Sequence, residues 1–423
     1  MFLYNQNSGT FIKTYFIVRI FTMITIQHFF YCLLFCLIFQ IEAKGQTVTT
    51  MRIDPDNAMG GTASQIFDSI TFIPLETNTE SLFGKISQME VTDKYFIILD
   101  DRVQKIMIFN KDGRFHAKIK TRDADTYFNY FTVNRKDSEI VTSGEYRDKL
   151  LIYDYGGKFL REEKIPLNLQ SIYYFNKNAI LYDERRPGKA TTENETRYDL
   201  AYSLGYMNLT KRLHIYNPKF TFGDYNLYYN TITNAGEPGL CMFSVPYDYT
   251  VYQLSDTGIV HQYKFIFPIK YSLPQNFATD SVYAGNREKF IYYTPENQGK
   301  FEAIVDNYKF GDYLLFSTWY EGRNDGNRNY IYNLKTNNLI SFGHVTGDSS
   351  SYYLPLLSSL YLERVDAVYD SQIYSSIPSI ILFSLKNKSE KNITYNKILE
   401  QYFKNGNKND NLVIVQLKLK DHL

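Results

Sequence analysis

Tryptophan and cysteine are scarce in this chain of 423 residues, which has one Trp and three Cys. So few cysteines exclude a disulfide-stapled scaffold. Neither sign of charge dominates, because 46 Lys and Arg oppose 45 Asp and Glu, so electrostatics gives no reason to expect nucleic acid or a membrane surface as a partner. What the chain does contain is 44% hydrophobic residues, enough for a folded core, together with 39 Tyr and 31 Phe. Aromatic residues suit pleated surfaces and therefore favour β structure.

Catalytic and cofactor motifs are also missing. The sequence contains no G-x-S-x-G, P-loop, G-x-G-x-x-G, H-E-x-x-H, paired C-x-x-C or complete EF-hand loop. The histidines are scattered, with no partner at the spacing of metal ligands; they are His28, His116, His214, His261, His344 and His422. Cys241 has no nearby His and is interpreted as a small buried hydrophobe. We expect no cofactor and no metal, and no catalytic residue can be assigned.

The N-terminal segment is typical of a secretory signal. Phe29–Ile41 is an apolar run of 13 residues, whereas a membrane-spanning helix needs about 20. Ala43 and Gly45 fit a cleavage site, which predicts a signal peptide over residues 1–45 and no membrane span in the mature chain. A lipid-modified Cys36 is the alternative, but the bulky Phe35 before it argues against an anchor. We expect export to the periplasm or cell surface, with translation starting at Met1 or Met23.

A repeat organises the mature chain. Gly113 closes an Asn/Asp/Gly turn between two β-type runs, and Gly157 repeats this arrangement 44 residues later. Two units of four short strands follow from the pattern of apolar runs and turns. The first comprises Lys85–Val91, Tyr95–Leu99, Lys105–Phe109 and Arg114–Ile119, and the second Phe128–Val133, Glu139–Ser143, Leu150–Tyr153 and Lys158–Ile165. This period is typical of β-propeller blades.

Looser units continue the pattern to the C-terminus. We predict an all-β, six-bladed β-propeller of four-stranded antiparallel blades over residues 66–423, preceded by an N-terminal extension over residues 46–65. Asn411–Lys420 alternates strongly and is expected to be the closing strand. Lys391–Lys404 has helical spacing, so a short amphipathic helix should precede that strand.

Several of these segments carry a family resemblance. Phe72–Asn78, Ser81–Ile86, Ile108–Gly113, Thr250–Leu254 and Asp410–Val413 are similar to segments of secreted six-bladed β-propellers from Bacteroides-type bacteria, which are NHL-like and TolB-like. The similarity covers about residues 66–420, and its motifs are structural turns. Leu412 stands where that family usually has proline. Because the family has no established activity, the resemblance implies a fold and a compartment rather than a reaction.

Two polar loops are the candidates for ligand binding, because rigid scaffolds display binding groups on loops. One contains Trp319, Tyr320, Glu321 and Arg323, which combine aromatic faces with charges, as sugar binding requires. The other contains Glu184, Arg185 and Arg186, which could clamp an anion. The alternatives are a Trp that fills a gap between blades and a solvated insertion.

Function is predicted only as a class. The missing catalytic motifs favour an exported binding or scaffold module for a glycan, peptide or protein at the cell envelope. One alternative is a lyase or hydrolase with ionisable side chains converging at the channel mouth. Another is a purely structural envelope subunit with an exposed apolar patch. Oligomeric state and ligand identity stay open.

Overall fold

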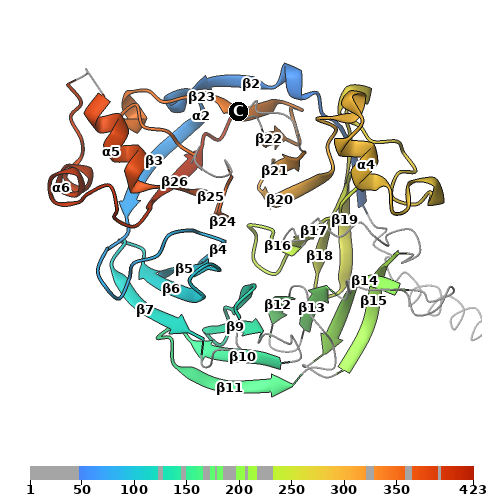
Figure 1. The fold of residues 1–423 in the computed structure, drawn as a ribbon, viewed down its shortest axis with the longest axis horizontal. Coiled ribbons are helices and arrows are strands. Elements are labelled where there is room, and N and C mark those ends of the chain that lie inside the picture. The colour runs from blue at the N-terminus through green and yellow to red at the C-terminus, as the bar shows by residue number, and fades with distance from the viewer. Residues whose placement is uncertain are drawn as a thin grey trace, which may run out of the picture. The chain divides into compact units, whose positions relative to one another are not determined.

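The structure is a computed structural model that describes residues 47–121, 127–143, 149–164, 172–176, 179–183, 197–204, 208–216, 232–320, 328–357, 364–388 and 392–423. Residues Val48–Leu423 form one compact unit. Within this unit the sheets surround a common centre (Figure 1).

The first two units predicted by the repeat are confirmed as antiparallel sheets of four strands with orders β4-β5-β6-β7 and β8-β9-β10-β11. Their strands are β4 (Gln88–Val91), β5 (Tyr95–Asp100), β6 (Lys105–Asn110), β7 (Phe115–Lys120), β8 (Phe131–Asn134), β9 (Glu139–Ser143), β10 (Lys149–Asp154) and β11 (Phe159–Lys164). Tight turns rich in Asn, Asp and Gly join the strands because these residues tolerate turn conformations.

Four further sheets follow in chain order. One contains β12 (Ile172–Asn176), β13 (Ala179–Asp183), β14 (Arg197–Leu204) and β15 (Asn208–Tyr216). The next contains β16 (Ile232–Asn234), β17 (Cys241–Phe243), β18 (Thr250–Ser255), β19 (Gly258–Ile266) and β1 (Thr47–Arg52). Another contains β20 (Ala303–Phe310), β21 (Tyr313–Trp319), β22 (Asn329–Asn333), β23 (Leu339–Thr346) and β2 (Met59–Thr62). The last contains β24 (Ala367–Tyr369), β25 (Gln372–Ile377), β26 (Val413–Leu419) and β3 (Phe67–Pro74).

The prediction of an all-β propeller with four-stranded antiparallel blades is confirmed, whereas the predicted number of six blades is wrong. Five of the sheets contribute buried residues from several of their strands to the hydrophobic clusters between neighbouring sheets, and these five sheets are the blades. The sheet β12–β15 lies between β8 and β16, which β12 contacts on either side. Two of the five blades have five strands, and β2 pairs with β23 in parallel. The sequence pattern missed the extra strands because β1 and β2 come from the segment interpreted as an extension.

That N-terminal segment runs along the outer edges of three successive blades (Figure 1). β1 pairs with β19, β2 with β23, and β3 with β26. A short 3₁₀ turn (Pro55–Asn57) and the helix α2 (Ala63–Ile66) connect these strands. The segment therefore covers sheet edges that would otherwise present unpaired backbone groups.

Helices occur in the connections between strands and outnumber the prediction. The expected helix at Lys391–Lys404 is present as α6 (Lys397–Asn405), whose first turn is capped by the Asn396 side chain through the Leu399 amide at 2.9 Å. A second helix, α5 (Ser379–Lys388), also lies between β25 and β26, and α4 (Arg287–Tyr292) lies between β19 and β20. Short 3₁₀ turns accompany them at Ile269–Tyr271, Ser281–Tyr283, Pro295–Asn297 and Ser349–Ser351.

The hydrophobic core is divided among the spaces between neighbouring sheets. Phe96 and Phe109 of the blade β4–β7 pack with Tyr374 and Ile414 of the blade β24–β3. The opposite face of the blade β4–β7 packs against the blade β8–β11, for example through Ile97. Strands buried on both faces explain why phenylalanine and tyrosine are so frequent.

Ring closure joins the two ends of the compact unit. β26 pairs with β3 in antiparallel register from Val413 opposite Pro74 to Leu417 opposite Ile70, and the pairing continues past a bulge. Both faces of β26 are buried, with Val415 in one inter-blade cluster and Ile414 in the next. The predicted closing strand is therefore confirmed.

Asn411 fixes this closure just before β26. Its side-chain amide donates to the carbonyls of Glu76 at 2.7 Å and Ser81 at 2.9 Å, and its side-chain oxygen accepts from the Phe83 amide at 3.0 Å. The Asn411 amide also donates to the Thr77 hydroxyl at 2.8 Å. One buried side chain thus satisfies three backbone groups of the segment that follows β3.

The repeated glycines have a structural reason. Gly113 and Gly157 adopt positive φ of 88° and 78° at equivalent turns. A Cβ at Gly113 would collide with the carbonyl of Pro74 in β3, and one at Gly157 would lie 2.8 Å from the carbonyl of Lys118 in β7. Each turn therefore touches the outer strand of the preceding blade, which only glycine permits.

We expect Asn411→Ala to lower the free energy of unfolding by about 3 kcal/mol, because the buried Ser81 carbonyl and Phe83 amide lose their partner, whereas the Glu76 carbonyl still accepts from the Ser81 hydroxyl. The neighbouring Asn409 is exposed, so Asn409→Ala provides the control. Urea unfolding of the purified chain measures both, and equal losses in the two variants would contradict the role of Asn411.

We expect Gly113→Ala to destabilise the fold much more than Gly239→Ala. Both glycines have positive φ, but a Cβ at Gly239 would meet no atom within 4 Å. Gly239→Ala should therefore cost only the conformational penalty of about 1 kcal/mol, whereas Gly113→Ala adds a backbone collision worth roughly 1–3 kcal/mol more. Thermal unfolding of the matched pair measures the difference, and similar melting temperatures would refute the proposed blade contact.

Candidate functional site

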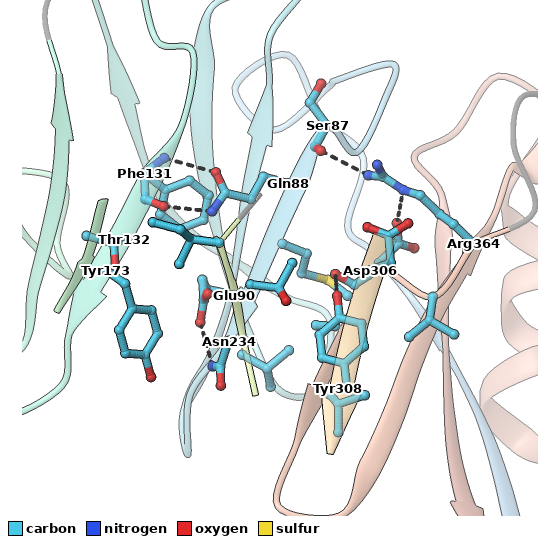
Figure 2. Close-up of a pocket in the computed structure, with 18 of the residues that line it drawn as sticks. Ser87, Gln88, Glu90, Phe131, Thr132, Tyr173, Asn234, Asp306, Tyr308 and Arg364 are labelled. Carbon is cyan, nitrogen blue, oxygen red and sulfur yellow. Dashed lines mark hydrogen bonds and ion pairs between the residues drawn. The ribbon is translucent and has the colours of Figure 1, made fainter. Parts of the chain in front are cut away.

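A small cavity lies where the inner strands converge on the centre of the ring (Figure 2). Residues from β4, β8, β12, β16 and β20 line it, together with the segment 364–368 that leads into β24. The volume available to water is about 50 Å³, far below the roughly 300 Å³ of ordinary ligand pockets. Polar and apolar side chains both line the cavity. The ionisable ones are Glu90, Asp306, Tyr308, Arg364, Asp366 and Tyr173.

Arg364 and Asp366 form one side of this axial cavity. Arg364 Nε lies 3.2 Å from Asp366 Oδ1, and Arg364 Nη2 donates to the Ile86 carbonyl at 2.7 Å. The same Nη2 donates to the Ser87 carbonyl at 3.0 Å (Figure 2). The Ser376 hydroxyl donates to the other Asp366 oxygen at 2.7 Å. The guanidinium therefore joins the last blade to the first.

Burial and charge act in opposite directions on this pair. Burial raises the pKa of Asp366, and Arg364 and Ser376 oppose that rise. Burial alone would lower the pKa of Arg364, but Asp366 and Asp306 more than compensate and raise it. The ion pair is thus maintained within a site that otherwise disfavours charge.

Asp306 is placed in the cavity by a bulge in β20. The pairing of β20 with β21 shifts register between Val305 and Tyr308, and Asp306 has a positive φ of 49°. Bulges re-aim side chains, and a left-handed non-glycine residue inside a strand is strained unless its surroundings hold it. The next residue, Asn307, supplies that support, because it donates to Ser244 Oγ at 3.2 Å and its carbonyl accepts from Thr233 Oγ1 at 2.8 Å.

Burial raises the pKa of the Asp306 carboxyl. Arg364 opposes the rise, and Asp366 adds to it. The Tyr308 ring, only 6% exposed, stands beside this carboxyl, and its hydroxyl makes one long contact of 3.5 Å with the Asp366 carbonyl (Figure 2). Burial also raises the Tyr308 pKa well above its usual value, so the hydroxyl is protonated and can donate.

Glu90 forms the other side of the cavity. Its carboxylate lies 2.9 Å from Arg135 Nη2 and accepts from the Asn234 side chain at 3.2 Å, which links β4 to β16. Arg135 also donates to the Val91 carbonyl at 2.9 Å and stacks on the Tyr369 ring at 5.0 Å. Burial raises the pKa of Glu90, whereas Arg135 and Asn234 oppose the rise.

Of the residues predicted to bind ligand, the structure describes Trp319 and Tyr320, and neither lines the axial cavity. Trp319 ends β21, and Tyr320 is only 1% exposed and packs against Phe301 with ring centroids 5.4 Å apart. Arg328 lies over both rings, 5.4 Å from Trp319 and 4.6 Å from Tyr320. Glu321, Arg323, Glu184, Arg185 and Arg186 lie outside the described residues. Trp319 and Tyr320 therefore share a contact with Arg328. Their role in ligand binding stays a prediction.

Sequence reasoning missed the axial residues. Their signal was ionisable residues inside or beside apolar β runs, as in Ile304-Val305-Asp306 and Arg364-Val365-Asp366. Such interruptions look like ordinary strand ends until the topology shows that these strands meet at the axis.

Other candidate chemistry is limited in the described residues. They contain no group of three or more His, Cys, Asp or Glu able to hold a metal ion. Cys241 is fully buried, and burial raises its thiol pKa, so the prediction of a small buried hydrophobe is confirmed. No helix in the described ranges has the length and apolar character needed to cross a bilayer.

We expect Asp306→Asn to stabilise the protein at pH 8 and to lose this effect at low pH. A folded pKa above the unfolded value of about 3.9 means that ionisation of Asp306 opposes folding as pH rises through the folded pKa. Asparagine tolerates the positive φ and does not ionise, so the free energy of unfolding at pH 8 should rise by about 0.5–2 kcal/mol. Chemical unfolding between pH 4 and 8 measures the effect.

Asp366→Asn is the matched control for this experiment. It removes the partner of the Arg364 guanidinium, so it should destabilise the fold by about 1–3 kcal/mol at neutral pH. If Asp306→Asn lowered the free energy of unfolding at every pH, the carboxyl would stabilise the bulge. That result would contradict the conclusion that ionisation of Asp306 opposes folding.

Comparisons with known proteins agree with this fold. The sequence matches a family described as a domain of unknown function, DUF4934, over residues 50–418. No curated protein matches it in sequence. Among solved structures, a presumed exported protein from Bacteroides fragilis superposes with a TM-score of 0.65 and 15% identity, covering 89% of this chain and 100% of the other.

Two further structures are much looser matches. A streptogramin B lyase has a TM-score of 0.37 and 12% identity over 85% of this chain and 99% of its own. A protein of unknown function from Bacteroides caccae has a TM-score of 0.36 and 10% identity over 61% of this chain and 81% of its own. Neither carries an argument at such scores. The predicted resemblance is thus confirmed as far as a β-propeller family, and secretion stays a prediction. The family match spans most of the sequence, and the chain therefore belongs to the DUF4934 family.

Proposed function

We propose that this protein is an exported binding module that recognises a peptide or protein partner at the cell envelope by taking one of its polar groups into the axial cavity. The observation that carries this proposal is the set of ionisable groups in the cavity, with Asp306 held there by a strained bulge. Buried charges disfavour folding unless they are paired, and Asp306 has no ion pair among the described residues, so its presence is better explained by a ligand than by stability.

The size of the cavity favours a side chain over a sugar. About 50 Å³ accommodates a group of a few heavy atoms but not a sugar ring. A glycan could reach only the outer surface, for instance at Trp319. Export is supported by the apolar run Phe29–Ile41 and by the similarity to a presumed exported protein.

An enzyme is the second candidate, because Asp306, Arg364 and Asp366 converge in one cavity. Carboxyl groups with raised pKa values can serve as proton donors near neutral pH. The two functions differ in the fate of the ligand, since a binding module releases it unchanged. Mass spectrometry of ligand recovered after incubation distinguishes them.

Binding of the purified chain to peptide and glycan arrays tests the proposal. We expect the chain to bind peptide spots in preference to glycan spots. We expect Ala367→Leu to abolish binding to the peptide spots. Ala367 lines the cavity, and leucine fills it without changing a charge. Thr132→Leu is a second variant that fills the cavity from β8, in case the first folds poorly. Trp319→Ala should leave peptide binding intact.

Three results would overturn the proposal. They are silence on both arrays, binding that survives both filled-cavity variants in folded protein, and binding that depends on Trp319 alone. Thermal unfolding of each variant verifies that it is folded.

A further inference from the structure

We infer that the polar group taken into the axial cavity is a cation, either an ammonium or a guanidinium, bound by the Asp306 carboxylate. This inference rests on the proposed function and names the chemistry of its ligand. A lysine or arginine side chain of a partner, or a small organic amine, would supply such a group.

The first support is the balance of charge. The cavity and its immediate partners contain the carboxylates Glu90, Asp306 and Asp366 and the guanidiniums Arg135 and Arg364. Arg135 pairs with Glu90 at 2.9 Å, and Arg364 pairs with Asp366 at 3.2 Å. In the described part of the chain, no Lys, Arg or His nitrogen forms an ion pair with Asp306. One negative charge is therefore left for a ligand.

The second support is that an anion would find few donors. Arg364 is the cation that acts on the Asp306 carboxyl, but its Nε and Nη2 are occupied by Asp366 and by the carbonyls of Ile86 and Ser87, which leaves only Nη1 to donate to an anion. A ligand anion would also lie beside three carboxylates. A ligand cation meets the Asp306 carboxylate and can donate to the oxygen of the Tyr308 hydroxyl, which stands beside it (Figure 2).

The third support is preorganisation. The bulge fixes the Asp306 backbone, and Asn307 ties that bulge to β16 through the Thr233 hydroxyl and to Ser244. A carboxylate held in place loses little freedom when it binds a ligand. Its limited hydration inside the cavity also strengthens an ion pair relative to one in water.

Binding of a cation should be linked to proton release. Burial raises the pKa of Asp306, and a bound cation would lower it again, so affinity should increase with pH as the carboxyl ionises. The titratable groups that line the cavity with Asp306 are Arg364 and Asp366 from the last blade, Tyr308 from its own strand, Glu90 from β4 and Tyr173 from β12. Burial also raises the pKa of Glu90 and Asp366, so their ionisation would change affinity in the same direction.

Calorimetric titration of the full chain with ethylguanidinium and propylammonium tests the inference, with propionate and propanol as the anionic and neutral probes. We expect both cations to bind wild-type protein, to bind about tenfold more weakly to Asp306→Asn, and to bind more tightly at pH 8 than at pH 6. Asp256→Asn, which removes an exposed carboxylate from the β18–β19 turn, should change nothing.

Stronger binding of propionate than of the cations would overturn the inference, as would equal cation affinity in wild type and Asp306→Asn. The filled-cavity variant Ala367→Leu separates this failure from failure of the proposed function. Array ligands that are lost in Ala367→Leu but retained in Asp306→Asn would leave the binding module intact and refute the cation. Array ligands retained in both variants would refute the module itself.

Discussion

The pairing of β3 with β26 is the constraint on which the rest of the structure depends. β3 is the outer strand of the last blade although it comes from the early part of the chain, so its pairing with β26 closes the ring. Asn411 makes that meeting specific by binding the backbone on both sides of Ser81, and the turn glycines then allow each blade to touch the one before it. Strands closed in this way are buried on both faces, which accounts for the aromatic composition.

Closure also explains why charged side chains occur at the axis. Each inner strand directs part of its side chains toward the same small volume, so residues far apart in sequence, such as Glu90 and Asn234, come within hydrogen-bonding distance. Packing at the axis would be simplest with apolar residues, because buried ion pairs contribute little net stability. The stability supplied by the inter-blade cores is what can hold an arrangement such as the Asp306 bulge, which opposes folding locally.

The sequence predicted the parts of this fold that depend on local pattern. The strands from Gln88 to Lys164, the turns at Gly113 and Gly157 and the closing strand were all found where expected, because alternation and turn chemistry are local properties. The number of blades was wrong, and the added edge strands β1 and β2 were missed because they are strands only through pairing with distant edges. The axial site was missed for the same reason: nothing near Asp306 in sequence indicates that Arg364 and Glu90 will face it.

The axial cavity and the predicted loops need not be competing explanations of binding. A group of a few heavy atoms contributes at most about 1.5 kcal/mol per atom, so a cavity of about 50 Å³ can select a ligand by charge but supplies only part of a high affinity. Further contacts must come from surfaces around the axis that a larger partner covers. Arg135 stacked on Tyr369, at the Glu90 side of the cavity, is such a surface, with the residue types that dominate binding energy in protein interfaces. A partner that places one cation on the axis and spreads over this aromatic rim would combine selectivity from the interior with affinity from the exterior.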